Sequence, residues 1–332
     1  MASLNIAIVG ITGAVGQEML NCLESRDFPV NELRPLASVR SAGKTIHFRN
    51  EEIVIQELTN NSFEGIDIAL FSAGGNISKE FGKAAASAGA VVIDNSSAFR
   101  MDEGVPLVVP EINPNDALNH NGIIANPNCT TIITLMGLNP LHQKWNALNI
   151  IASSYQAVSG SGAQGIKELK SQISAIHEGK EIETNVYPCQ IAHNVIPQVD
   201  KFLENGYTKE EMKMENEGRK ILDNPSLKAS VTCVRVPVYR SHSIAATVQF
   251  ESSPNVEEAK ILISEAEGVN VMDDPESGIF PTTLDTTEKD DCLVGRLRED
   301  IVLENSLSFW VVGDQVRKGA ALNAVQIAEL LK

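Results

Sequence analysis

Short runs of almost wholly apolar residues recur through the first third of the chain, and amphipathic stretches separate several of them. The runs have the length and β-branched content of strands, whereas the amphipathic stretches place apolar residues at helical spacing. The predicted strands are 4–9, about 33–39, about 52–56, 67–71 and 90–94, and the predicted helices are about 14–25 and 78–88. Strands that alternate with helices predict βαβ units on a parallel sheet with both faces covered.

The pattern changes after residue 129, where the strands become longer and the helices fewer. The predicted strands are 149–155, 230–236, 243–251 and 306–312, and the predicted helices are 162–177, 209–222 and 257–266. This part therefore predicts a second, α+β domain around a mixed sheet. The charged run 285–291 is expected to be a solvated turn. Residues 317–331 have apolar positions at helical spacing, and we expect this helix to pack back on the first domain.

Composition narrows the class of protein. A chain of 332 residues is long enough for two domains, and its net charge of −16 argues against nucleic acid or an anionic membrane as partner. The five cysteines are scattered without a CxxC pair, which indicates reduced thiols rather than disulfides or a zinc site. No apolar run reaches the roughly 20 residues of a membrane span, and no secretory signal precedes the first strand. A soluble, cytoplasmic protein is expected.

A glycine-rich loop follows the first predicted strand directly. Its glycines are Gly10, Gly13 and Gly16, in a strand–turn–helix context that is typical of dinucleotide-binding domains. Glycines allow the tight turn and let backbone N–H groups approach a pyrophosphate at the helix N-terminus. A structural turn in an α/β protein is the alternative, and the context favours the cofactor.

The end of the second predicted strand discriminates between nicotinamide cofactors. NAD-binding sheets usually place a carboxylate there, which bonds the ribose 2′-hydroxyl. This strand end has no carboxylate and instead carries Ser38, Arg40 and Ser41, which could hold a 2′-phosphate. The sequence therefore favours NADP over NAD.

Cys129 is the strongest candidate for chemistry. An apolar stretch stops at Pro127, and residues 130–136 begin a buried helix, which places the sulfur at a helix N-terminus where a thiolate is favoured. His242 follows Arg235 by seven residues and could be the partner base. Together with the glycine loop, these residues predict hydride transfer through a thioester. The other cysteines are expected to be small buried hydrophobes.

The chain resembles the aspartate-β-semialdehyde dehydrogenase family over nearly its full length. The segments that carry the resemblance are long and unusual in composition: GITGAVG at 10–16, ASVRSAGK at 37–44, SAGG at 72–75, DNSSAFRMD at 94–102, VPLVVPEIN at 105–113, NPNCTT at 126–131, YQAVSGSG at 155–162, NEGRKIL at 216–222, RVPVYRSHS at 235–243 and GDQVRKGAALNAVQIAE at 313–329. The resemblance implies a Rossmann-type NADP-binding domain formed by 1–128 and 315–332, and a catalytic and dimerisation domain formed by 129–314.

The resemblance also implies a reaction. Aspartyl phosphate would be reduced by NADPH to aspartate semialdehyde, with release of inorganic phosphate, in lysine, threonine, methionine and diaminopimelate biosynthesis. Cys129 would be the nucleophile, His242 the general base and Gln156 the residue that orients the substrate.

Further residues would bind the substrate and cofactor. The substrate carboxylate and ammonium would pair with Arg235 and Glu217 respectively. Phosphate would lie against Arg100, Asn128 and Lys220. The implied cofactor contacts are Gly10, Thr12, Gly13, Ala14, Val15, Gly16, Ser38, Arg40, Ser41, Ser159, Gly160 and Gln315. A homodimer or a dimer of dimers is implied, and no metal site, nucleic acid or membrane.

Two residues depart from the family pattern. The family usually has threonine at Gly218, which could loosen that helical turn, and asparagine at Gln315, near the nicotinamide. Without the resemblance, Glu217 and Lys220 would be interpreted as a surface i,i+3 pair, and Arg100 as an exposed arginine at a strand end.

Two alternative functions remain open. N-acetyl-γ-glutamyl-phosphate reductase shares the fold and chemistry, but an acylated amine needs no carboxylate partner, so Glu217 disfavours it. A catalytically silent paralogue acting as a binding subunit is disfavoured because Cys129, His242, Gln156 and Arg235 are all retained.

Overall fold

A computed structural model describes residues 3–332, and the chain divides into two compact units. The first comprises the described residues up to Asn128 together with Ala320–Lys332, and the second comprises Cys129–Gly319. The candidate nucleophile is thus the first residue of the second unit. No helix within residues 3–332 is both long and apolar enough to cross a membrane.

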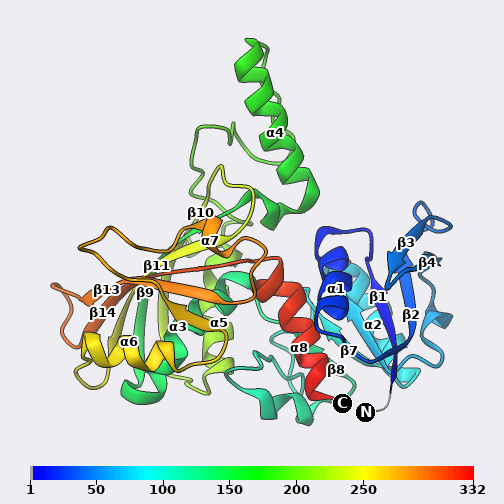
Figure 1. The fold of residues 1–332 in the computed structure, drawn as a ribbon, viewed down its shortest axis with the longest axis horizontal. Coiled ribbons are helices and arrows are strands. Elements are labelled where there is room, and N and C mark those ends of the chain that lie inside the picture. The colour runs from blue at the N-terminus through cyan, green and yellow to red at the C-terminus, as the bar shows by residue number, and fades with distance from the viewer. Residues whose placement is uncertain (1–2) are drawn as a thin grey trace. The chain divides into compact units, whose positions relative to one another are not determined.

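An all-parallel sheet forms the centre of the first unit, with strand order β5-β2-β1-β6-β7-β8 (Figure 1). Its strands are β1 (Leu4–Val9), β2 (Val30–Ala37), β5 (Gln56–Glu57), β6 (Ile68–Phe71), β7 (Val91–Asp94) and β8 (Ile123–Ala125). Every residue of β6 and β8 is buried, because helices cover both faces. The predicted Rossmann-type sheet is confirmed.

Two sets of helices cover the faces of this sheet. The helical elements are α1 (Ala14–Ser25), η1 (Asn60–Phe63), α2 (Gly75–Ser87), η2 (Pro114–Asn119) and α8 (Leu322–Leu330). Residues of α1 and α8 share one core with Ile6 and Ile8 of the sheet, whereas α2 and η1 share the other with Phe71. A separate antiparallel pair consists of β3 (Thr45–Phe48) and β4 (Glu51–Val54).

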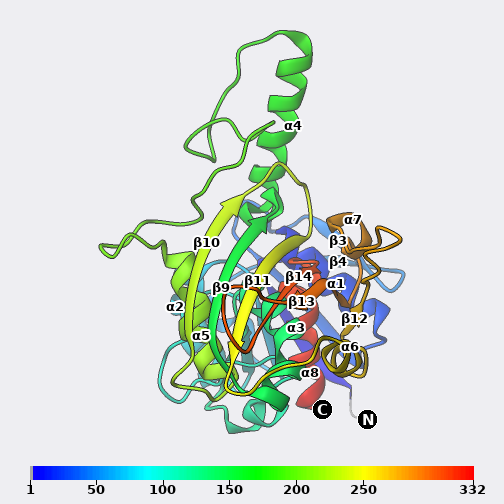
Figure 2. The same ribbon diagram turned by 90° about the vertical axis from the view of Figure 1, so that its left-hand side faces the viewer.

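The second unit contains a mixed sheet, as predicted, with strand order β10-β9-β11-β14-β13-β12 (Figure 2). Its strands are β9 (Ala147–Gln156), β10 (Lys228–Arg235), β11 (His242–Phe250), β12 (Val269–Val271), β13 (Cys292–Glu299) and β14 (Ser306–Gly313). The pairs β9–β10 and β12–β13 are parallel, and the other neighbours are antiparallel.

The two faces of this second sheet differ in burial. On β9, Ile150, Ala152 and Ser154 are buried, whereas Ile151 and Tyr155 are exposed, because successive side chains point to opposite faces. The helices α3 and α5 pack against the strands of the sheet and give it a buried face. The other face, which we call the open face, carries the exposed residues.

The helical elements of the second unit are α3 (Cys129–Trp145), η3 (Val158–Ser161), α4 (Gly162–Glu178), α5 (Lys209–Ile221), α6 (Val256–Ser264), α7 (Thr283–Thr286) and the π-helical turn η4 (Arg317–Ala321). Helix α4 extends away from the second sheet (Figure 1 and Figure 2). The chain that follows α4 is held by buried polar groups. Glu168 accepts the Asn185 N–H at 2.8 Å, and Gln172 accepts the Ile191 N–H at 2.9 Å.

Several predicted boundaries were wrong for identifiable reasons. The expected strand 52–56 is two strands, because β4 pairs with β3 and only β5 joins the parallel sheet. The C-terminal helix begins with a π-helical turn rather than at α-helical spacing. The charged run 285–291 is more than a solvated turn, since Asp290 accepts the Arg317 Nε–H at 2.7 Å.

Candidate active site

Three predicted site residues converge at one edge of the second sheet. Gln156 and Arg235 are directly paired in register at the carboxyl ends of the parallel strands β9 and β10. His242 begins β11, which runs antiparallel to β9, so it lies at the same edge. The pairing of three strands therefore brings together residues that are up to 86 positions apart, from Gln156 to His242.

Arg235 is held rigidly at this edge. Its backbone forms an antiparallel bridge with Ile196, and its Nη1 donates to the Ala157 carbonyl at 2.7 Å. A Cβ atom at Gly160 would lie 2.7 Å from Nη1 of Arg235 and 3.3 Å from Nε2 of His242. Gly160 is thus the residue that lets the η3 turn approach both side chains closely.

His242 is fully buried, and its two ring nitrogens have different surroundings. Nδ1 accepts the backbone N–H of Ala157 at 3.1 Å, whereas Nε2 has no hydrogen-bond partner among the described residues. An acceptor at Nδ1 places the proton of the neutral ring on Nε2. Burial, reinforced by the nearby Arg235 charge, lowers the pKa of His242 to about 3. The ring is therefore neutral near pH 7 and presents Nε2–H as a donor.

Cys129 is the first residue of α3 and is partly exposed, so its sulfur lies at the N-terminal end of that helix as predicted. A Cβ atom at Gly319 would lie only 2.8 Å from Cβ of Cys129, so the chain at 319 passes directly against the nucleophile. The other cysteines differ in setting. Cys22, Cys233 and Cys292 are buried, and burial raises the pKa of Cys233 to about 12. The prediction that all four are buried was wrong for Cys189, which is exposed.

Gln315 connects the η3 turn to the residue before His242. Its amide nitrogen donates to Oγ of Ser159, and its Oε1 accepts the Ser241 N–H at 2.7 Å. Ser241 has a φ of 70°, a left-handed conformation that is uncommon outside glycine. The longer glutamine at 315 therefore has two protein partners of its own, while its contact with a nicotinamide stays a prediction.

Glu217 and Lys220 lie on α5, the helix that packs against β10 and α3. Glu217 is 2% exposed, so the alternative of a surface ion pair is wrong for this residue. A Cβ atom at the neighbouring Gly218 would lie 3.1 Å from Leu227, which shows that the glycine permits close packing of α5. The expectation that Gly218 loosens this helical turn stays a prediction, and the structure shows that the residue lies buried within α5.

The glycine loop of the first unit has the geometry that a dinucleotide requires. Gly10 has a φ of +84°, and a Cβ atom there would lie 2.7 Å from the Ser72 carbonyl oxygen. Gly13 caps α1, whose first turn contains Ala14 and Val15 and no acidic residue. Thr12 lies in the turn between them. The helix N-terminus is therefore shaped for close approach of an anion.

The end of β2 forms a turn in which the Ser38 carbonyl accepts the Ser41 N–H at 2.8 Å. Arg40, within this turn, is exposed.

Arg100 is only 7% exposed and donates from Nε to the Asn126 carbonyl at 2.9 Å, so the interpretation of an exposed arginine is wrong. Asn128 is also buried.

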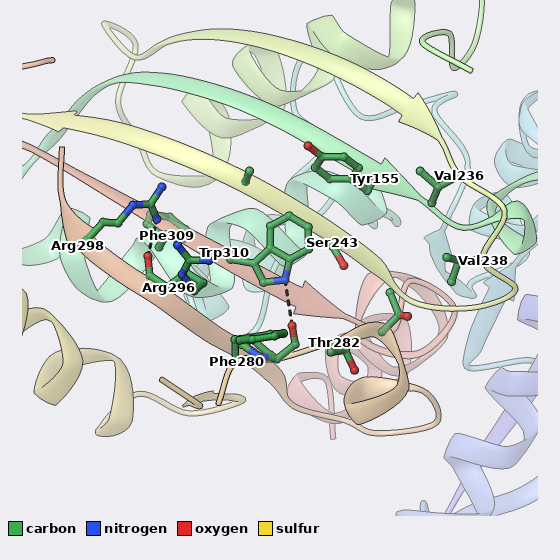
Figure 3. A pocket seen from close by; sticks show the side chains of 13 residues that line it. Tyr155, Val236, Val238, Ser243, Phe280, Thr282, Arg296, Arg298, Phe309 and Trp310 are labelled. Atoms are coloured by element: carbon green, nitrogen blue, oxygen red, sulfur yellow. Dashed lines mark hydrogen bonds between the residues drawn. The ribbon is translucent and has the colours of Figure 1, made fainter. Parts of the chain in front are cut away.

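Sequence reasoning missed Glu210, a buried carboxylate on α5 that accepts a hydrogen bond from Gln156. Its only sequence signal is the cap formed by Thr208 and Glu211, which predicts the helix start but not which glutamate faces inward. A cavity of about 540 Å³ was also unforeseen. It lies over the open face beside Tyr155, Ser243 and Trp310, and none of the predicted site residues lines it (Figure 3).

Comparison with known proteins identifies the class to which this fold and site belong. Residues 5–120 match the family described as semialdehyde dehydrogenase, NAD binding domain, and residues 138–318 match semialdehyde dehydrogenase, dimerisation domain. The chain is therefore an oxidoreductase of the semialdehyde dehydrogenase class, with a nicotinamide-cofactor domain and a domain that supports oligomerisation.

Individual relatives narrow this class. An aspartate-semialdehyde dehydrogenase of Bacillus subtilis is 49% identical over 99% of this chain and 97% of its own. One from Aquifex aeolicus is 51% identical over 98% and 97%. The crystal structure of aspartate semialdehyde dehydrogenase II of Vibrio cholerae, complexed with ASA, superposes with a TM-score of 0.97 at 46% identity, covering 100% of this chain and 98% of that one. The chain belongs to the aspartate-semialdehyde dehydrogenase family.

Proposed function

We propose that this protein is an NADP-dependent, phosphorylating aspartate-semialdehyde dehydrogenase. The observation that carries the proposal is the convergence of Gln156, Arg235 and His242 at one sheet edge, in a unit whose first residue is Cys129. In the biosynthetic direction it reduces L-4-aspartyl phosphate to L-aspartate 4-semialdehyde. The product then serves lysine, threonine, methionine and diaminopimelate biosynthesis in the cytoplasm.

The glycine loop supports a dinucleotide cofactor, because side chains at Gly10 and Gly16 would collide with the backbone around the turn. When bound, NADP(H) supplies the hydride acceptor or donor. Gly10, Thr12, Gly13, Ala14, Val15 and Gly16 would hold its pyrophosphate, with Ser159, Gly160 and Gln315 as further contacts. Arg40, Ser38 and Ser41 would hold the 2′-phosphate, since this strand end offers a cation and no carboxylate. A relative from Candida albicans, 25% identical, was solved with NADP.

Cys129 forms the covalent intermediate. Its thiolate attacks the aldehyde carbon to give a thiohemiacetal, and loss of hydride leaves a thioester that phosphate cleaves. The N-terminus of α3 stabilises both the thiolate and the oxyanion. His242, predicted as a general base, is set up to donate from Nε2 to the substrate oxygen, because Nδ1 is already an acceptor. Gln156 orients the substrate.

The remaining polar residues recognise the two ends of the substrate. Arg235 pairs the carboxylate, for which its planar guanidinium is suited, and Glu217 takes the ammonium. Arg100, Asn128 and Lys220 bind the phosphoryl group. In an otherwise acidic chain, confining a second anion near the thioester would be costly unless the reaction used it.

The open face of the second sheet is proposed as the contact with a second copy in a homodimer, or in a dimer of dimers. It lies within the residues that match the dimerisation family and carries the exposed Ile151 and Tyr155. The ring centroids of Tyr155 and Trp310 lie 5.3 Å apart there, with the ring planes tilted at 45°, and offer an aromatic surface beside the cavity (Figure 3).

Phosphate dependence tests the reaction directly. NADPH formation from aspartate semialdehyde should stop after about one turnover per site when phosphate is removed, because only an oriented phosphate cleaves the thioester quickly. It should resume with phosphate or arsenate.

Lys220→Ala should raise the phosphate KM more than the aldehyde KM. Lys209 is an exposed lysine of the same helix, and Lys209→Ala should change neither KM. Sustained turnover without phosphate would place the protein among hydrolytic aldehyde dehydrogenases.

A further inference from the structure

The amide of Gln156 is anchored through its nitrogen. Nε2 donates to Oγ of Ser154 at 3.1 Å and to Oε1 of Glu210 at 3.3 Å. A primary amide nitrogen has two hydrogens, so these partners use both. No described residue donates a hydrogen bond to the side-chain oxygen of Gln156. The oxygen is therefore the end of the amide that is available to a ligand at the sheet edge.

Glu210 is the partner that allows only one orientation of the Gln156 amide. Serine can donate or accept, so Ser154 would tolerate either orientation of the amide, whereas a carboxylate can only accept. Oε2 of Glu210 is paired with Nζ of Lys213 at 2.6 Å, one helical turn along α5. This ion pair fixes the carboxylate with Oε1 directed at Gln156. Turning the amide over would set two oxygens against each other in a buried site.

We propose that Glu210 is a positioning residue, which fixes the amide of Gln156 so that its carbonyl oxygen faces the substrate and accepts a hydrogen bond from it. Gln156 would then recognise a donor on the substrate, either its ammonium or the hydroxyl of the thiohemiacetal. It would not be a donor to the oxyanion, a role that Nε2–H of His242 is placed to fill. This inference rests on the proposed function, because it assumes that Gln156 meets the substrate.

The neighbouring glutamate provides a matched control. Glu211 is equally buried and lies in the same turn of α5, but within residues 3–332 it accepts only backbone N–H groups, from Thr208 and from Cys233 at 2.9 Å. Its replacement should lower stability without a specific effect on turnover. The two carboxylates thus separate a positioning role from a merely structural one.

A double-mutant cycle tests the inference. Glu210→Gln keeps the shape but offers Gln156 either end of an amide, so kcat/KM for aspartate semialdehyde should fall about tenfold to a hundredfold, with the NADP KM unchanged. In the Gln156→Ala background, the same substitution should change kcat/KM by less than about twofold. Glu211→Gln should lower Tm and leave kcat/KM within about twofold. If Glu210→Gln does not fold, Glu210→Asp can be carried through the same cycle.

Equal losses from Glu210→Gln in both backgrounds would overturn the inference, because the effect would then not pass through Gln156. Full activity of Gln156→Ala would also overturn it, by showing that Gln156 does not meet the substrate. Neither result would contradict the proposed phosphorylating reaction. That reaction is tested separately by the phosphate dependence of turnover in the unmutated protein.

Discussion

At the scale of single residues, the cysteines show how strongly setting decides chemistry. Cys129 stands at a helix N-terminus and is partly exposed, whereas Cys233 is buried with a raised pKa. We expect Cys129→Ser to abolish turnover and leave Tm and NADP binding nearly unchanged, because the side chains are close in size.

Stoichiometric iodoacetamide should inactivate the enzyme by labelling Cys129, as peptide mass spectrometry would show. The exposed Cys189 is the control, since Cys189→Ser should retain full activity; activity loss that tracks labelling of another cysteine contradicts the assignment.

His242 makes stability depend on pH in a defined direction. Its folded-state pKa, about 3, lies below the ordinary 6.5, so the unfolded chain takes up this proton first as pH falls. The stabilisation is therefore complete above pH 6.5 and is lost progressively between 6.5 and 3. In urea unfolding, the free energy of unfolding should fall between pH 7 and pH 5 more steeply for the wild type than for His242→Gln. The difference in slope should correspond to the uptake of up to about one proton on unfolding.

His142 is an internal control in this comparison, because burial also lowers its pKa and it is present in both proteins. Identical pH dependence of unfolding in the wild type and His242→Gln would mean that folding does not lower the pKa of His242. The pH dependence of activity should likewise show no titration of His242 near pH 6.5, because its folded-state pKa is about 3.

The sequence predicted which residues could carry chemistry, but not how each is held. The motifs around Gln156, Arg235 and His242 are visible along the chain, and register then brings them together. Glu210 was missed because, in sequence, it looks like one end of an i,i+3 pair with Lys213 on a polar helix. Only tertiary packing turns that pair inward.

At the scale of elements, continuous apolar runs predicted the parallel strands well, because burial on both faces leaves a simple signal. The short strands β3 and β12 were not predicted, and neither was the eight-residue strand β13. The register of β13 with β14 shifts between Gly295 and Arg298, and local propensity is a weak signal where pairing with a neighbouring strand decides the structure. The strand predicted at about 33–39 is β2, which spans Val30–Ala37 instead. Its bounds have the same origin, because pairing with β1 sets where β2 begins and ends.

The turn after β2 should set cofactor preference. Arg40 is exposed there, and we expect Arg40→Ala to weaken NADP use about tenfold to a hundredfold, from a charge-assisted contact of roughly 1.5–3 kcal/mol. The loss should be measured as kcat/KM with NADP, and NAD is the control cofactor because it lacks the 2′-phosphate. Equal losses with the two cofactors would show that this turn does not read the 2′-phosphate.

At the scale of the whole molecule, the open face should control assembly. Ile151 is 52% exposed on it, and burying an arginine there without a partner is strongly unfavourable. We expect Ile151→Arg to convert the proposed homodimer to monomers in sedimentation velocity. Leu118→Arg, at a residue of the first unit that is 68% exposed, should remain dimeric. An unchanged sedimentation coefficient for Ile151→Arg would exclude this face as the contact.

Strand β9 ends at Gln156, on the face where Ser154 is buried, and presents Tyr155 and Ile151 on the other. A substitution in this strand alters one side chain on one face. An insertion or deletion of a single residue would instead exchange the two sets, sending the amide outward and the aromatic ring inward. The length of this segment should therefore be fixed more strictly during evolution than the identity of its outward-facing residues, and engineered changes here should replace residues and never add or remove one.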